Sequence, residues 1–125
     1  MNQTPDTRIE HDLVGDRELC NSVYYGVHTL RATENFPITD VPVSIYPDLV
    51  RALASVKKAA AITNNELGVL NDERTKAIVA ACDEILAGEL HDQFVVDVIQ
   101  GGAGTSTNMN ANEVMTNRAL EIMVH

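Results

Sequence analysis

Two neighbouring stretches, residues 47–68 and 71–88, repeat apolar side chains at the three- and four-residue spacing of amphipathic helices. Pro47 suits the first turn of a helix, and Asp48 complements the positive end of its dipole. Gly68 is a natural stop. The predicted apolar stripe of this first helix consists of Leu49, Val50, Leu53, Val56 and Ala60.

The second stretch has its own start and stop signals. Asn71 is a favoured N-cap residue, acidic residues follow in the first turn, and Gly88 ends the pattern. Its predicted apolar face consists of Ile78, Ala81, Cys82, Ile85 and Leu86. Because only a short connection joins the two stretches, they favour an antiparallel helical hairpin.

The segments on either side are less regular. Residues 8–13 alternate weakly, with Ile9 and Leu13 on one side, and Gly15-Asp16 follows as a turn signal, so a short strand or hairpin is expected there. Residues 24–35 predict one or two helical turns, weakened by Gly26, and a proline-rich loop follows. The fold class predicted is therefore mainly α, a small helical domain with a short N-terminal strand or hairpin region.

Composition limits the classes of function. At 125 residues the chain is the length of one domain, and 45% hydrophobic with 22% charged residues is typical of a globular protein. A net charge of −9 argues against nucleic acid binding, which needs a basic stripe. No apolar run approaches the roughly 18 residues of a membrane span. The first residues also lack a secretory signal, so we expect a cytoplasmic protein that does not bind membranes.

Cysteines and histidines give no sign of a metal site. Cys20 and Cys82 have no C-x-x-C spacing; a disulfide is possible, and two buried thiols are favoured. The four histidines show no metal-ligand spacing, so no metal site is expected.

The most unusual segment is residues 100–113, which read QGGAGTSTNMNANE. A buried extended run, FVVDVI at residues 94–99, leads into it, and a helix is predicted from about Ser106. The P-loop pattern fails because no lysine follows Lys76, and the dinucleotide pattern fails because Thr107 stands where its third glycine belongs. What remains is a glycine turn that leads hydroxyl side chains onto a helix N-terminus.

A helix N-terminus attracts a carboxylate or phosphate through its free amides and positive dipole end. On this reading, the hydroxyl of Thr105 faces the anion and Ser106 or Thr107 caps the helix. A plain N-cap after a tight turn is the alternative. Asparagines at 108, 110, 112 and 117 favour buried hydrogen bonding to neighbouring elements, because amides are poor helix formers.

A second candidate pair lies near Tyr24 and Tyr25. His28 and Arg31 are one helical turn apart and are able to grip a carboxylate, with Arg31 binding it bidentately. The alternative is a surface arginine beside a structural histidine.

Several co-linear blocks carry a family resemblance. They read RIEHDLVGDRE from Arg8, YYGVHTLRATENFPIT from Tyr24, DQFVVDVIQGGAGTSTNMNANEV from Asp92, and NRALEIM up to Met123. Together they resemble the amino-terminal part of enzymes of the fumarase/aspartase superfamily, on its aspartase side. Class II fumarases carry a serine at the position of Ala103. Residues 1–125 are accordingly interpreted as the N-terminal domain of such a lyase.

The resemblance implies reversible elimination of ammonia from L-aspartate to give fumarate, without a cofactor. It implies that Thr105 contacts substrate, that Gly104, Ser106 and Asn108 support it, and that Arg31 contributes to substrate binding. The catalytic base is expected in a segment beyond His125, so no catalytic residue is expected in this chain and the chain alone should be inactive. The whole enzyme is expected to be a homotetramer. Two alternatives are a class II fumarase-type hydratase domain and a non-catalytic anion-binding or interaction module.

Overall fold

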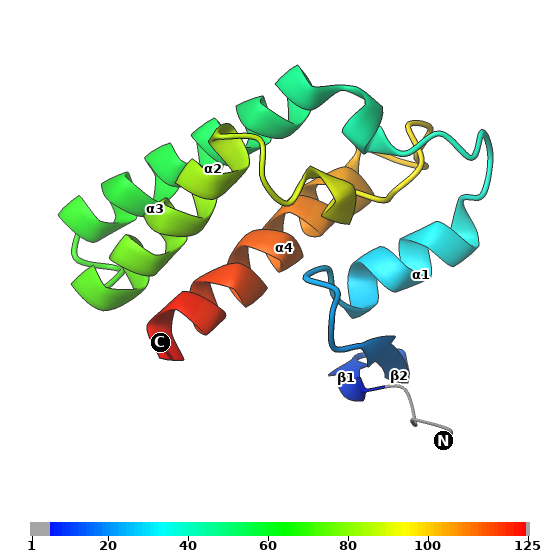
Figure 1. Ribbon diagram of the computed structural model, residues 1–125, viewed down its shortest axis with the longest axis horizontal. Coiled ribbons are helices and arrows are strands. Elements are labelled where there is room, and N and C mark those ends of the chain that lie inside the picture. The colour runs from blue at the N-terminus through cyan, green and yellow to red at the C-terminus, as the bar shows by residue number, and fades with distance from the viewer. Residues whose placement is uncertain (1–5, 125) are drawn as a thin grey trace.

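A β-hairpin and four α-helices make up residues 6–124, the part of the chain that the computed structural model describes (Figure 1). The elements are β1 (Thr7–Asp12), β2 (Gly15–Cys20), α1 (Val27–Asn35), α2 (Pro47–Glu66), α3 (Asp72–Leu86) and α4 (Thr105–Val124), with short 3-10 turns η1 (Val43–Ile45) and η2 (His91–Gln93). The predicted fold class, a small and mainly α domain with an N-terminal hairpin, is confirmed.

The hairpin pairs β1 with β2 in antiparallel register, from Thr7 opposite Cys20 to Asp12 opposite Gly15. The turn itself is Leu13-Val14, two residues earlier than the predicted Gly15-Asp16. The carboxylate of Asp12 closes it by accepting hydrogen bonds from the amides of Val14 (2.9 Å) and Gly15 (3.1 Å). Leu13 lies at the tip and is fully exposed, so the expected apolar side of this strand is not a core face.

Helices α2 and α3 form the predicted hairpin and lie side by side (Figure 1). Pro47 occupies the first turn of α2, and the side chain of Asn71 accepts a hydrogen bond from the amide of Arg74 at 2.9 Å, as its N-cap role predicts. The apolar face of α3 is confirmed, since Ala81, Cys82 and Ile85 are fully buried.

The predicted stripe of α2 is partly wrong. Val50 is fully buried, but Leu49 and Val56 are 42% and 64% exposed, and Ala60 is exposed as well. The buried residues are Val50, Ala54 and Ala61. Two of these three are alanines, so the buried face of α2 is not the one with the largest apolar side chains.

Helix α4 packs against α3 on one side and α1 on the other, and it carries the middle of the core (Figure 1). The extended segment of residues 94–98 crosses beneath it, with Phe94 and Val96 fully buried. This segment makes an isolated antiparallel bridge between Asp97 and Pro42. The prediction of buried extended chain is confirmed. The main core cluster also includes Val50, Cys82, Ile85, Ala111 and Val114.

The two cysteines are free thiols in different environments. Cys82 is buried, and burial raises the pKa of its thiol to about 11. Cys20 is exposed on the hairpin, which corrects the prediction of two buried thiols. A hydrogen bond with Ser22 lowers the pKa of the Cys20 thiol. None of the helices within residues 6–124 combines the length and apolarity that crossing a membrane requires.

Candidate functional site: the glycine turn and the N-terminus of α4

Two glycines in the turn before α4 have a left-handed backbone. Gly102 has a φ of 70° and Gly104 a φ of 77°, values that residues other than glycine rarely adopt. No atom lies within 4 Å of where a Cβ would stand at either position. The turn therefore exposes backbone to open space at the point where the helix begins.

The first turn of α4 presents free amides. The first intrahelical hydrogen bond runs from the amide of Asn108 to the carbonyl oxygen of Gly104, at 3.2 Å. The amides of residues 105–107 therefore have no acceptor within the helix. No other group within residues 6–124 accepts a recorded hydrogen bond from them. Gly104 stands at the cap position without a side chain, which corrects the expectation that Ser106 or Thr107 caps the helix.

The predicted binding residues gather at this helix start. Thr105 is exposed, as a hydroxyl that meets a ligand must be, and Ser106 is half-buried beside it. The side chain of Asn108 is exposed, and its carbonyl oxygen accepts a hydrogen bond from the ammonium of Lys57 at 2.6 Å. Lys57 comes from α2 and adds a positive charge beside the first turn. No sequence pattern pointed to this contact, because Lys57 and Asn108 are 51 residues apart in the chain.

Buried asparagines anchor α4 to the rest of the fold. Asn110 is fully buried; its carbonyl oxygen accepts the amides of Val95 (2.9 Å) and Val96 (3.3 Å), and its amide donates to the carbonyl of Gln93 at 2.9 Å. The amide of Asn117 donates to a carbonyl in the segment before α1 at 2.7 Å. The predicted buried hydrogen bonding is confirmed for Asn110, and its contacts fix the helix start relative to the extended segment. Asn117 is half-buried and Asn108 is exposed, so the prediction is wrong for Asn108.

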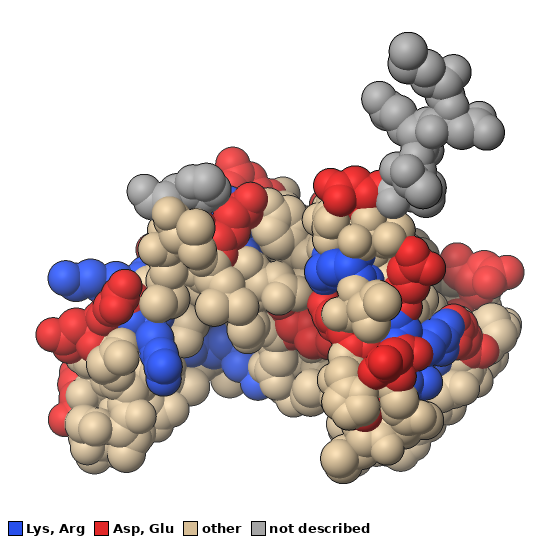
Figure 2. Space-filling view, turned by 90° about the horizontal axis from the view of Figure 1, so that it is seen from below, with Lys and Arg blue, Asp and Glu red and all other residues tan. Residues whose placement is uncertain are grey.

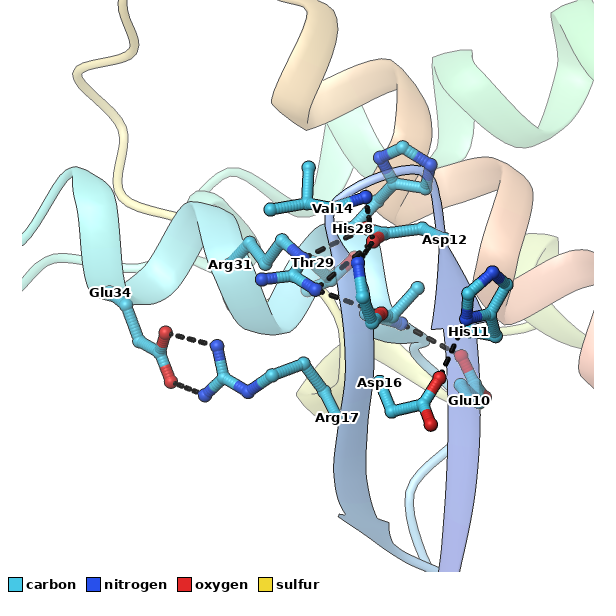
Figure 3. A network of polar contacts seen from close by, with 12 residues as sticks. Glu10, His11, Asp12, Val14, Asp16, Arg17, His28, Thr29, Arg31 and Glu34 are labelled. Atoms are coloured by element: carbon cyan, nitrogen blue, oxygen red, sulfur yellow. Dashed lines mark hydrogen bonds and ion pairs between the residues drawn. The ribbon is translucent and has the colours of Figure 1, made fainter.

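Arg31 has no recorded contact with the residues at the start of α4. Figure 3 shows its guanidinium reaching from α1 to the hairpin, where it binds both carboxylate oxygens of Asp12 at 2.8 and 3.0 Å. It also donates to the carbonyl of Gly15 at 3.1 Å. Hydrogen bonds from Arg31 hold the pKa of Asp12 below its usual value, and the amides of Val14 and Gly15 contribute. The bidentate geometry was foreseen, but its partner belongs to the chain, and substrate binding by Arg31 stays a prediction.

The other predicted member of that pair, His28, is exposed beside the hairpin turn. Its backbone amide is used within the fold, since it donates to the carboxylate of Glu113 at 3.1 Å. Arg31 is thus a half-buried arginine tied to the hairpin and not a surface one, whereas His28 contributes only its backbone amide to the recorded contacts.

The N-terminus of α1 is closed by carboxylates that sequence reasoning missed. Glu113, from α4, accepts the amide (2.8 Å) and the hydroxyl (2.7 Å) of the fully buried Thr29. Glu10, from β1, accepts the amide of Val27 at 2.8 Å. Gly26 is required here, since a Cβ at that position would lie 2.0 Å from Glu113 Oε2. The only available signal was a glycine placed directly before a helical pattern.

Charges of both signs share the face shown in Figure 2, where Lys and Arg side chains lie next to Asp and Glu without a continuous basic stripe. Within residues 6–124, no group of three or more His, Cys, Asp or Glu side chains is placed to hold a metal ion. The electrostatic feature that suits an anion is therefore the open end of α4 with Lys57 beside it.

Comparison with known proteins identifies the family. A family model described as a lyase matches residues 15–125. An aspartate ammonia-lyase from Bacillus sp is 57% identical over 118 residues, which are 94% of this chain and 25% of that protein. This chain belongs to the fumarase/aspartase superfamily of lyases. An aspartate ammonia-lyase from Pseudomonas aeruginosa is 55% identical over all 125 residues, which make up 26% of its length.

Solved structures of this lyase superfamily share the fold. A fumarate lyase:delta crystallin from Brucella melitensis superposes with a TM-score of 0.93 at 57% identity, covering 95% of this chain and 28% of that one. A class II fumarase from Schistosoma mansoni gives a TM-score of 0.85 at 36% identity, covering 94% of this chain and 25% of that one. The chain thus spans about a quarter of the length of the lyases that it matches.

Proposed function

We propose that this chain supplies the amino-terminal part of an aspartate ammonia-lyase and forms one wall of its substrate site. The observation that carries the proposal is the open N-terminus of α4, with the exposed Thr105 directly after a left-handed Gly104. The high identity to proteins named aspartate ammonia-lyase supports the choice of substrate.

The proposed reaction is the reversible elimination of ammonia from L-aspartate. A base takes the proton from Cβ, the electron pair moves to form the carbon–carbon double bond, and the C–N bond breaks to release ammonia, leaving fumarate. Negative charge builds up on the carboxylate next to Cβ before the C–N bond breaks. Preorganised amides and hydroxyls stabilise such charge where it develops. In this proposal, Thr105 and the backbone at Gly104 and Ser106 bind that carboxylate, and Asn108 supports the turn.

The remaining parts of the proposal concern the whole enzyme. We place the base in a segment beyond His125 and expect the chain alone to be inactive. We also propose a cytoplasmic homotetramer that acts on L-aspartate, fumarate and ammonia, without a metal or cofactor and without binding nucleic acid or membranes. The net charge of −9 supports the last point, since nucleic acid and anionic lipid surfaces both repel an acidic protein.

A chimaera tests the function. Replacing the matching segment of the Bacillus sp relative with this chain should preserve fumarate formation from L-aspartate, followed by its ultraviolet absorbance. Thr105→Val in that chimaera should lower kcat/KM about a hundredfold, because it removes a preorganised donor. Thr63→Ala, at an exposed threonine of α2, is the matched control and should have no effect. Full activity of the Thr105→Val chimaera would remove the basis of the proposal.

A hydratase is the second candidate, favoured by the structural match to a class II fumarase. The lower identity, 36% against 57%, and Ala103 in place of the fumarase serine both speak against it. Placing the chain in the Schistosoma mansoni fumarase scaffold should give a chimaera with weak hydration of fumarate. Hydration there as fast as in the parent enzyme, combined with an inactive aspartase chimaera, would favour the hydratase instead.

A further inference from the structure

Asp97 is a buried carboxylate in the middle of an apolar segment, and it is only 7% exposed. Its Oδ2 accepts the amides of Thr39 (2.7 Å) and Asp40 (3.0 Å). Its Oδ1 accepts the hydroxyl of Thr39 (2.9 Å) and the amide of Ile99 (2.8 Å). Four donors therefore converge on a single side chain, and among residues 6–124 no salt bridge accompanies them.

These contacts join two loops that are distant in the sequence. Asp40 has a left-handed backbone, with a φ of 57°, and its amide is held by the carboxylate of Asp97. The amide of Val98 donates to the carbonyl of Val41 at 2.9 Å, which continues the pairing on the other side of Asp97. The loop of residues 36–42 thus packs against the segment that leads into the glycine turn.

A second contact between the two loops lies further along the turn. A Cβ at Gly101 would stand 2.8 Å from the ring of Phe36, so backbone and ring are in close contact there. The side-chain amide of Gln100 donates to the carbonyl of Asp97 at 2.7 Å and closes the turn on itself. Beyond these contacts, Gly102 and Gly104 meet nothing within 4 Å of a Cβ. The position of the turn is therefore set at its base, around Asp97.

We propose that Asp97 is a positioning residue for the anion-binding turn. Its carboxylate fixes the glycine turn on the 36–42 loop and thereby sets where the backbone at Gly104 and the hydroxyl of Thr105 stand. Asp97 itself lies beneath the turn and acts on the substrate only through these groups. Its effect on catalysis rests on the proposed function, whereas its effect on the order of the turn does not.

The charged form of the side chain is essential to this role. A carboxylate offers acceptor positions on both oxygens, so it satisfies all four donors. An asparagine at this position has one oxygen, and its amide group would face two N–H or O–H donors without accepting from them. Asp97→Asn therefore keeps the shape of the side chain and removes about half of the acceptors.

The first test uses the chain itself and measures amide hydrogen exchange by NMR. The readouts are the hydrogen-bonded amides at the two ends of the glycine turn, Val98, which donates to the carbonyl of Val41, and Asn108, which donates to the carbonyl of Gly104. In the Asp97→Asn variant, exchange at both should rise about tenfold relative to wild type, the effect of losing about one hydrogen bond. The amides of α3 should keep their wild-type rates. Equal acceleration in α3 would show a general loss of stability, and unchanged rates at Val98 and Asn108 would show that Asp97 does not order the turn; either result overturns the proposal.

Asp83→Asn is the matched control. Asp83 is half-exposed in α3 and bonds only to the ammonium of Lys58 in the recorded contacts, at 2.6 Å. Surface pairs of this kind contribute little to stability. This variant should leave exchange in the glycine turn unchanged.

The second test is a double-mutant cycle in the Bacillus sp chimaera. Asp97→Asn alone should lower kcat/KM for L-aspartate, and adding it to Thr105→Val should cause little further loss, because both changes disable the same donor. Losses that multiply would show that Asp97 does not act through Thr105. If the unaltered chimaera is inactive, the proposed function fails, and the exchange experiment still decides whether Asp97 positions the turn.

Discussion

The N-termini of α1 and α4 offer the same chemistry and meet opposite fates. At α1, the carboxylates of Glu10 and Glu113 accept the first-turn amides, including those of Val27 and Thr29. At α4, the amides of residues 105–107 have no recorded acceptor within residues 6–124. The protein fills one helix end with its own anions and leaves the other open.

The glycines before the two helices show why. Gly26 has an ordinary backbone, with a φ of −116°, and is needed because two carboxylates occupy the space of a Cβ. Gly104 has open space around it and is needed for its left-handed backbone. A helix N-terminus attracts anions in general; whether it serves the fold or a ligand depends on which side chains can reach it.

The largest loss of stability is expected from removing a carboxylate that closes the N-terminus of α1. Glu113→Ala leaves the amide and hydroxyl of the fully buried Thr29 without an acceptor, and should lower the free energy of unfolding by about 3 kcal/mol. Urea denaturation measures this. Glu66→Ala, at the exposed end of α2, is the control and should change stability by less than about 0.5 kcal/mol. Equal losses would remove the distinction between the two ends.

Alanine at the two glycines should separate a steric effect from a backbone effect. Gly26→Ala should cost about 2 kcal/mol, because the new Cβ overlaps the carboxylates of Glu113 and Glu10. In Gly104→Ala the new Cβ lies near no other atom, so the free energy of unfolding should fall by about 1 kcal/mol through the left-handed φ alone. Adding Glu113→Ala should rescue part of the first loss and none of the second. Rescue of both would mean that the carboxylate contact is not the cause.

Low pH should weaken the hydrogen bonds of Asp97, which hold the turn before α4 in place. Burial alone would raise the pKa of Asp97, but the amides of Ile99, Thr39 and Asp40 hold it below the ordinary 3.8. Because the folded-state pKa is the lower one, the resulting stability is present above pH 3.8 and is lost as the pH falls through the folded value. Stability followed by circular dichroism against pH should therefore fall more steeply for wild type than for Asp97→Asn. Identical slopes would contradict the shift.

The smallest effect is expected when a dicarboxylate ligand is used to compare the N-termini of α4 and α1. Titrating the chain with succinate should shift the amide resonances of residues 104–107, with a dissociation constant on the order of 1 mM or weaker, because only one wall of the site is present. The amides of residues 27–29 should not move, since carboxylates already occupy them. Shifts of equal size at both ends would show that the α4 terminus has no special role.

Local patterns were sufficient for the elements. The caps and glycine stops of α2 and α3 lie inside the segments that they define, so the helical hairpin was predicted with nearly correct bounds. The packed face of α2 was not, because Ala54 and Ala61 are buried while Val56 is 64% exposed. Hydrophobic periodicity marks which residues are able to face a core, and tertiary packing decides which of them are buried.

The candidate binding residues come from the same local reasoning. Thr105, Gly104, Ser106 and Asn108 lie within five residues of one another, so the sequence alone places them together at a helix start, and their role in binding stays a prediction. Asp97 gave a weak signal as a lone acid in an apolar run, which must find hydrogen-bond donors if it is buried. Nothing in the sequence indicated that the donors lie in the loop of residues 39–40.

The sequence by itself determined where α2 and α3 begin and end, and that a glycine turn precedes α4, because these depend on backbone preferences of neighbouring residues. Only the tertiary structure decided which helix end is closed and which is open. Glu113 meets Thr29 across 84 residues of chain, and Arg31 meets Asp12 rather than a ligand. Such pairings depend on the relative placement of packed elements, which no local pattern encodes.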